Sequence, residues 1–347
     1  MKQSTRIISK EMQRNHTLDT LRTIAALLVI LLHVSAEYVG SAMDKNSYNL
    51  SFWIGNVFDS YSRIAVPIFV IISGELLVGR KESFIETYRK RMNRILIPLI
   101  SWTIVYLIYQ GAMNYIPNRN VYAISLIKSV ILGSPFFHLW YLYMIAGLYL
   151  VIPIINNSIL KTSRRNVFYI STLLLIFGSI NTSYNTFFGN KPIFILNFIN
   201  YLGYFLSGFL LKEYQNNISK KLLLSLYLIS SLLISILTYY TAKCCNSLYF
   251  YGYLSPFVII ASFSFYRLVR QANFKENFLS KISHLTLGLY LIHAGILYSF
   301  LILLKNLNIH ILDNAFIGIP IKFIVTFSIS IVIANIFFKT KYLKRLI

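Results

Sequence analysis

The sequence predicts an all-α, polytopic membrane protein, and three observations support this. Of the 347 residues, 56% are hydrophobic and only 13% are charged, far fewer charged residues than a soluble domain carries. Mean hydropathy is +0.61. The apolar residues form long runs, close to the ~20 residues that a helix needs to cross a bilayer. This composition excludes a soluble globule and a disordered chain. The two adjacent cysteines, Cys244 and Cys245, exclude a disulfide scaffold.

Ten apolar segments are predicted to be transmembrane helices. The second is long and contains Pro67, which predicts a tilt or a kink, and the fifth is short. In order, the segments are Leu18–Val39, Phe52–Val78, Ile95–Met113, Phe136–Ile155, Val167–Asn181, Ile193–Leu211, Leu222–Thr241, Leu248–Leu268, Leu285–Leu304 and Phe316–Phe338. We expect a single domain over residues 1–347, with an N-terminal segment (1–17), a transmembrane bundle (18–338) and a tail (339–347).

The placement of the basic residues predicts the orientation of these segments. A net charge of +22 is compatible with nucleic-acid binding, but the Lys and Arg residues lie in short clusters between the apolar runs. Most of them fall in alternate connections and at the two ends of the chain. By the positive-inside rule, both termini then lie in the cytoplasm, and we expect no nucleic-acid partner. Arg22 and His33 interrupt the first segment, so we expect a retained span rather than a cleaved signal peptide.

Ionisable residues inside the first segment are the first candidates for a functional site, because such groups are costly in hydrocarbon unless paired or hydrated. Arg22 and His33 lie on one helix face, about 16 Å apart along the axis. Asp19 precedes Arg22 by one turn. Glu37 follows His33 by one turn, where a carboxylate can hold one imidazole nitrogen and leave the other as a base. Alternatively, Asp19 and Arg22 snorkel to the interface and His33 is a core histidine.

The next two segments add further candidates. Arg63 follows Asp59 by four residues, the spacing of an ion pair, and serves either as a buried strut or as a functional cation. Glu75 lies near the cytoplasmic end of the second segment, after a Ser-Gly pair that allows close helix approach. Arg91 and Arg94 precede the third segment at a spacing that suits a phosphate or pyrophosphate. Contact with lipid headgroups is the alternative for these two arginines.

Aromatic and histidine side chains in the fourth and ninth segments complete the set. We expect His138 and Trp140 near the outer surface, where an interfacial aromatic belt is the alternative to a functional role. His293 lies near mid-depth with Tyr290 one turn away, and we favour a core histidine bonded to a neighbouring helix. The sequence has no H-E-x-x-H, no Cys/His metal spacing and no phosphate-binding glycine loop, so we expect no metal and no nucleotide-driven pump.

Ordered by depth, these residues form a column that suits a tunnel. A phosphorylated donor would anchor at its cytoplasmic end and react further out. The cytoplasmic group is Arg22, Glu75, Arg91 and Arg94, the intermediate group is Arg63 and His293, and the outer group is His33, Glu37 and His138.

Five motifs in this order resemble the acyltransferase-3 family of bacterial integral membrane O-acyltransferases. Within that family, the chain is most similar to surface-polysaccharide O-acetyltransferases of the enterobacterial-common-antigen type. The motifs are LDTLRTIAALLVILLHVSA, IFVIISGELL, YRKRMNRILIP, HLWYLYMIAGLYLVIPII and SHLTLGLYLIHAGIL.

The resemblance implies a role for individual residues and a location in the bacterial cell (inner) membrane. The family's Arg and His pattern falls on Arg22 and His33, and its Arg-x-x-Arg pattern falls on Arg91 and Arg94. It implies that His33 is the catalytic histidine and that the arginines serve the acyl-coenzyme A donor. Glu75 departs from the pattern, because an apolar residue is expected after Ser-Gly. We also expect no extracytoplasmic hydrolase-like domain of the kind that some relatives carry.

The resulting hypothesis is a membrane O-acyltransferase that moves an acyl group, expected to be acetyl, from acetyl-coenzyme A to a hydroxyl of a surface glycan or its lipid-linked precursor. His33 is the general base, Glu37 orients it, and Arg22 or Arg63 stabilises negative charge. Direct transfer and an acyl-histidine intermediate both fit, and we favour direct transfer. A transporter or flippase for a lipid-linked saccharide is the alternative, and a lipid-binding scaffold is a third possibility. Residues with a substrate-binding or supporting role are Asp19, Arg63, Glu75, His138, Trp140, Tyr290 and His293.

Overall fold

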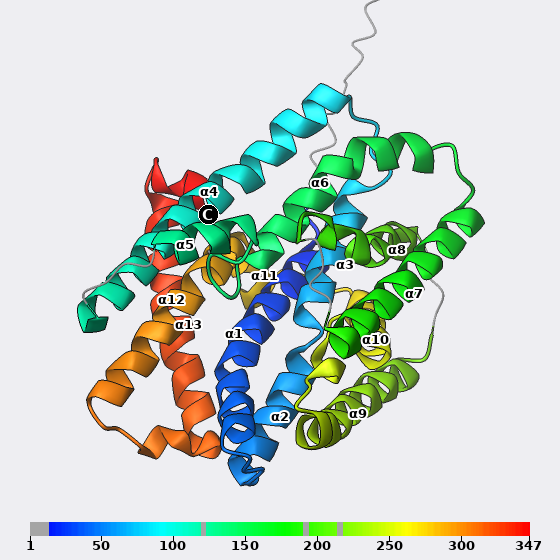
Figure 1. Cartoon of the computed structure of the whole chain (residues 1–347). Helices are drawn as coiled ribbons and strands as arrows, with labels where there is room; N and C mark the ends of the chain where they lie inside the picture. The colour runs from blue at the N-terminus through cyan, green and yellow to red at the C-terminus, as the bar shows by residue number, and fades with distance from the viewer. Residues whose placement is uncertain (1–13, 119–122, 190–193, 214–217) are drawn as a thin grey trace, which may run out of the picture.

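Every regular element that the structure describes is a helix (Figure 1). The computed structural model describes residues 14–118, 123–189, 194–213 and 218–347. The α-helices are α1 (His16–Asp44), α2 (Leu50–Ser62), α3 (Ala65–Leu77), α4 (Phe84–Asn118), α5 (Ala123–Ile131), α6 (Trp140–Ile159), α7 (Arg164–Phe188), α8 (Leu202–Glu213), α9 (Lys220–Cys245), α10 (Pro256–Ala272), α11 (Phe278–Ile282), α12 (Thr286–Asn306) and α13 (Ala315–Lys339). The 3₁₀ helices are η1 (Phe194–Tyr201), η2 (Tyr249–Tyr251), η3 (Ser283–Leu285), η4 (Ile311–Asp313) and η5 (Leu343–Leu346).

Helix α1 runs through the middle of the bundle and contacts α2, α3, α12 and α13 (Figure 1). It begins after Asn15, whose side chain accepts a hydrogen bond from the Leu18 amide and so caps the first turn. Its 29 residues extend about 44 Å, which is longer than the ~30 Å hydrocarbon core of a bilayer. One helix can therefore carry functional groups from one membrane surface to the other.

The second predicted segment is interrupted between α2 and α3, close to the proline at which we expected a tilt or a kink. α2 ends at Ser62, and α3 starts at Ala65 after a turn through Arg63 and Ile64. Pro67 lies in the first turn of α3, where its missing N–H removes no helical hydrogen bond.

Two glycines bring α3 and α8 into close contact, as the Ser-Gly pair predicts for Gly74. A Cβ atom at Gly74 would overlap the carbonyl of Phe205, and one at Gly208 would overlap the carbonyl of Ile71. Small residues at such a crossing let two backbones approach, which gives helices in lipid their packing energy.

Nine helical stretches within the described residues are long and apolar enough to cross a membrane. The sixth predicted segment, whose first residue lies outside the described residues, is not among these nine. It is not one α-helix, because the 3₁₀ helix η1 continues directly into α8. At ~2.0 Å per 3₁₀ residue and ~1.5 Å per α residue, these two helices together extend about 34 Å. The segment is therefore long enough for a further crossing, and the polytopic helical fold is confirmed.

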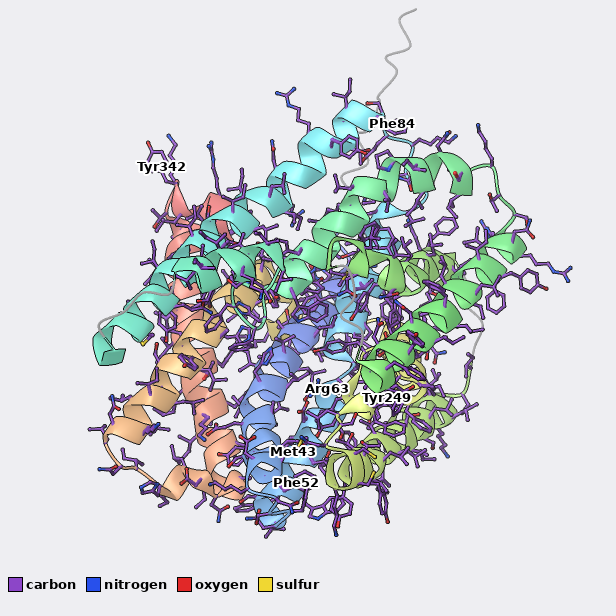
Figure 2. The ribbon with its side chains drawn as sticks, viewed as in Figure 1. Met43, Phe52, Arg63, Phe84, Tyr249 and Tyr342 are labelled. Carbon is purple, nitrogen blue, oxygen red and sulfur yellow. The ribbon has the colours of Figure 1, made fainter. Side chains whose placement is uncertain are left out.

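The outer surface of the bundle is strongly apolar, as Figure 2 shows for side chains that project outward. On α7, Leu173, Phe177 and Ile180 are 53–65% exposed. In water such a surface would aggregate, whereas in a bilayer it contacts lipid tails. The polar residues of the candidate site are instead turned toward the interior around α1.

Candidate active site

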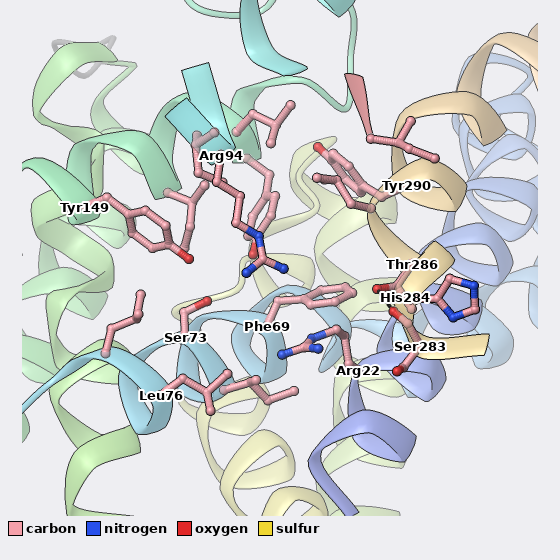
Figure 3. Close-up of a pocket in the computed structure, with 18 of the residues that line it drawn as sticks. Arg22, Phe69, Ser73, Leu76, Arg94, Tyr149, Ser283, His284, Thr286 and Tyr290 are labelled. Carbon is pink, nitrogen blue, oxygen red and sulfur yellow. Dashed lines mark hydrogen bonds between the residues drawn. The ribbon is translucent and has the colours of Figure 1, made fainter. Parts of the chain in front are cut away.

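A cavity of about 360 Å³ lies at the end of α1 that is predicted to be cytoplasmic; we call it the inner cavity. Side chains from α1, α3, α4, α6 and α12 line it (Figure 3). Its basic lining residues are Arg22, Arg80, Arg94 and His284, and no acidic side chain is among the described residues of the lining. Apolar and aromatic groups, including Phe69 and Tyr149, complete the walls. Such a cavity favours a ligand with both an anionic and an apolar part.

Arg22 and Arg94 reach into the inner cavity from different helices, α1 and α4 (Figure 3). Asp19 positions Arg22, because its Oδ1 accepts a hydrogen bond from Nη1 of Arg22 at 3.3 Å. Its Oδ2 accepts one from Nε of Arg14 at 2.7 Å. Two guanidinium groups that converge on one space can bind a phosphate or pyrophosphate through paired hydrogen bonds.

The basic cluster before the third apolar segment is helical, so α4 starts at Phe84, well before the predicted Ile95. Lys and Arg are good helix formers, and long basic side chains can reach the membrane surface from such a helix. Arg91 therefore precedes Arg94 by one turn of the same helix. The Arg91 side chain lies outside the described residues, so its predicted role stays a prediction.

His33 lies further along α1, in a cluster of aromatic rings. Its imidazole stacks on that of His293 with ring centroids 5.4 Å apart and planes inclined by 24°. Phe137 packs edge-on against it at 4.9 Å. No hydrogen bond joins the His33 ring to another residue within the described part of the chain, and the side chain is only half-buried. Its nitrogens are therefore available to a substrate.

The hydrogen bonds of His293 fix its protonation pattern. Its Nδ1 lies 2.7 Å from the carbonyl oxygen of Tyr290 and 3.1 Å from that of Leu289. Carbonyl oxygens only accept, so Nδ1 carries the proton and the neutral ring has its lone pair on Nε2. This Nε2 is buried without a partner among the described residues. The predicted bond to a neighbouring helix is wrong, because both carbonyls belong to α12 itself.

His138 and Trp140 are not at an outer surface, and that prediction is wrong. His138 is 1% exposed, with its ring 5.3 Å from that of His293. Trp140 stacks on Tyr253 at 5.6 Å. The chain from Phe136 enters the protein interior before α6 begins, which the apolar sequence FFHLW permits but does not distinguish from a surface position.

Tyr290 lies between the inner cavity and the three neighbouring histidines, His33, His138 and His293, which we call the histidine cluster. It lines the cavity, its ring packs on those of His138 and His293, and its hydroxyl donates a hydrogen bond to the His138 carbonyl. His33 is not among the lining residues of the inner cavity. The arginines of the inner cavity and the three histidines thus form two separate groups, and the side chain of Tyr290 lies between them.

Glu37 pairs with Lys322, which corrects the prediction that its carboxylate holds His33. Nζ of Lys322 donates a hydrogen bond to Oε2 of Glu37 at 2.8 Å, and this lysine is 1% exposed. Its ammonium group also lies 4.6 Å from the ring centroid of Tyr38. A lysine inside the last apolar segment requires a counter-charge, and that signal was present in the sequence.

Arg63 and Asp59 form the predicted ion pair, with Nη2 and Oδ2 2.7 Å apart. The guanidinium of Arg63 also lies 3.9 Å from the ring centroid of Tyr251. Asp59 is fully buried, and the charge of Arg63 contributes to the electrostatic environment of His33. The pair is thus a buried strut that also places a cation near the histidine cluster.

Glu75, the residue that departs from the family pattern, does not line the inner cavity. It is 3% exposed, forms an ion pair with Arg270 at 3.0 Å and accepts a hydrogen bond from the hydroxyl of Tyr266. Both partners lie on α10. The extra carboxylate therefore joins α3 to α10 on the side of α3 that faces away from the cavity.

A family model described as an acyltransferase domain matches residues 15–335. No curated protein and no solved structure matches this chain. The matched stretch contains His33, His138 and His293 and every lining residue of the inner cavity except Ile347. The chain therefore belongs to the acyltransferase-3 family of membrane proteins and is an acyltransferase.

Proposed function

We propose that this protein transfers an acyl group, acetyl in the simplest case, from acyl-coenzyme A to a hydroxyl of a cell-surface polysaccharide or its lipid-linked precursor, in the cytoplasmic membrane of a bacterium. The observation that carries the proposal is the arrangement along α1. An arginine-lined cavity lies at one end, and an imidazole with no hydrogen bond to the described residues lies further along the same helix. The resemblance to surface-polysaccharide O-acetyltransferases supports the choice of donor and acceptor.

The inner cavity is the donor site in this proposal. Arg22 and Arg94 bind phosphate oxygens of coenzyme A, and apolar and tyrosine side chains line the rest of the cavity. Tyr290 forms the wall nearest to the histidines. Its side chain has to move before an extended thioester arm can pass from the cavity to His33.

The reaction is a nucleophilic acyl substitution at the thioester. His33 takes the proton of the acceptor hydroxyl while the hydroxyl oxygen attacks the carbonyl carbon of the thioester. A C–O ester bond forms, the C–S bond breaks, and the proton on His33 leaves with the sulfur as free thiol. We assign the stabilisation of the developing oxyanion to Arg63, whose charge acts on His33, in preference to Arg22, which lines the donor cavity.

The direct test combines thiol release with the product. Purified protein is mixed with acetyl-coenzyme A and the lipid-linked saccharide fraction from cells that lack this protein. We expect free thiol to appear only when both substrates are present. Mass spectrometry of surface glycans should show acetyl esters in cells that have the protein and none in cells that lack it. A flippase consumes no donor, so unchanged donor together with a moved saccharide would support that alternative.

Arg94→Gln should raise the donor KM by about tenfold to a hundredfold, because a charged hydrogen bond contributes about 1.5–3 kcal/mol. Acceptor-dependent kcat at saturating donor should change little. Arg89→Gln is the matched control, since Arg89 is exposed on the same helix and does not line the inner cavity. Equal donor KM values for the two variants would indicate that Arg94 contacts lipid instead.

A further inference from the structure

A second cavity, of about 230 Å³, lies at the opposite end of α1; we call it the outer cavity. Met43 and Phe52, labelled in Figure 2, mark this end of the molecule, and Phe84 marks the other. The cavity opens to the surface, because residues such as Ser41 and Lys45 are exposed. Its lining comprises Glu37, Tyr38, Ser41, Ala42, Lys45, Ser47, Asn49, Ser51 and Asp313. It is smaller than the inner cavity, which has a volume of about 360 Å³, and it has room for a ligand of the size of one sugar ring.

The two cavities differ in chemistry. The inner cavity presents three arginines and no acidic side chain among its described lining residues. The outer cavity presents hydroxyl, amide and carboxylate groups, with the charge of Lys45 set against those of Glu37 and Asp313. The positive charge of the buried Lys322 offsets the negative charge of Glu37. Nδ1 of His310 lies within hydrogen-bond distance, 3.2 Å, of Oδ2 of Asp313. The outer cavity therefore offers few cations to bind a polyanion, but many hydrogen-bond donors and acceptors for an uncharged ligand with several hydroxyl groups.

Of the residues that line the outer cavity, Glu37 lies nearest to His33 along α1. It follows His33 by one turn of α1, about 6 Å along the axis. Lys322 binds its Oε2, and no described residue occupies Oε1. The Glu37 side chain is 34% exposed, so this second oxygen can accept a hydrogen bond from a hydroxyl in the cavity. The buried ammonium group of Lys322 thus holds a carboxylate in the wall of the outer cavity, one turn of α1 from His33.

We propose that the outer cavity binds the acyl acceptor as an uncharged, polyhydroxylated sugar unit, on the side of the membrane opposite to the donor. This inference rests on the proposed function and adds to it the side and the chemical class of the acceptor. Donor and acceptor then approach His33 from the two ends of α1. Neither substrate has to pass the other. The rings of Phe137 and His293 pack against His33 and limit the access of bulk water, and thereby the hydrolysis of the donor.

The test fills the outer cavity without touching the donor site. Ser41→Trp places an indole in the cavity, and we expect acceptor-dependent thiol release at subsaturating acceptor to fall roughly tenfold or more. Donor affinity, measured by equilibrium binding of labelled acetyl-coenzyme A, should stay unchanged. Asn306→Trp is the matched control, because Asn306 is exposed at the same end of the molecule and does not line the cavity.

The outcomes separate this inference from the proposed function. Equal thiol release by the Ser41→Trp and Asn306→Trp variants, with the wild type active, would overturn the outer site alone. Wild-type protein that releases no thiol with the saccharide fraction would overturn the proposed function itself.

A labelling experiment tests the chemical class of the ligand. In a Cys244→Ser, Cys245→Ser background, Ser41→Cys is treated with a membrane-impermeant thiol reagent in the presence of N-acetylglucosamine or glucuronate. We expect the neutral sugar to slow the modification more than the anionic one. Stronger protection by glucuronate, or none by N-acetylglucosamine, would contradict the proposal.

Discussion

Replacing His33 with glutamine is expected to lower kcat by about 10²–10⁴-fold, the usual contribution of a positioned general base. Glutamine has similar length and can still hydrogen-bond, but it cannot take a proton from the acceptor hydroxyl. Donor affinity should be retained, because His33 does not line the inner cavity. The measurement is steady-state thiol release alongside equilibrium binding of labelled acetyl-coenzyme A.

His16→Gln is the matched control for that variant. His16 is the first residue of the same helix and is not among the residues that line either cavity. It should show near wild-type turnover. A wild-type kcat in the His33→Gln variant would contradict the assignment of His33 as the general base. Loss of donor binding would indicate that the substitution disturbs the structure and not the chemical step.

Two substitutions at His293 separate a structural role from a role in positioning His33. Asparagine keeps an N–H donor near the position of Nδ1 but has no atom at the position of Nε2, whereas glutamine places an amide oxygen near Nε2. In our account the ring of His293 is stacked on that of His33 and holds the His33 imidazole in position; the longer glutamine side chain can keep part of this contact, whereas the asparagine side chain cannot. We expect His293→Asn to lose about 10²-fold in kcat, as misplaced catalytic groups do, and His293→Gln to lose less.

The opposite order of activity contradicts this role. If His293 only holds the carbonyls of Leu289 and Tyr290, the asparagine variant should be the more active one. Thermal unfolding of both variants serves as the control, since a purely structural effect would follow stability. Donor KM should be unchanged in both, which separates His293 from the inner cavity.

The membrane fold could be predicted from the sequence because each crossing helix is specified by its own composition. An apolar run of about 20 residues must form a helix in lipid, whatever its neighbours are. The break at Arg63 could be anticipated from Pro67 alone. The sixth segment could not be anticipated in the same way, because a change from 3₁₀ to α geometry at Tyr201 leaves no compositional sign.

Partners across helices could not be predicted, because helical periodicity defines a face but not what it contacts. Glu37 and His33 share a face of α1, yet the carboxylate pairs with Lys322 on α13. The ion pair at Asp59 and Arg63 could be predicted because both residues lie on the same stretch of chain.

His138 shows the same limit of local patterns. An aromatic cluster near the start of a segment is typical of a membrane interface, and only the fold shows that this one turns inward onto His293. Glu75 is comparable, since its partner Arg270 is distant in the sequence and nothing near Glu75 indicates it.

The most direct test of the central claim is a single-turnover experiment with isotope-labelled acetyl-coenzyme A, run side by side on wild-type protein and His33→Gln. We predict that the wild type forms one labelled ester on the saccharide for each free thiol, and that His33→Gln binds the donor but forms neither at a comparable rate. Ester formation by His33→Gln at the wild-type rate would contradict the account, as would saccharide that crosses the membrane while the label stays on coenzyme A.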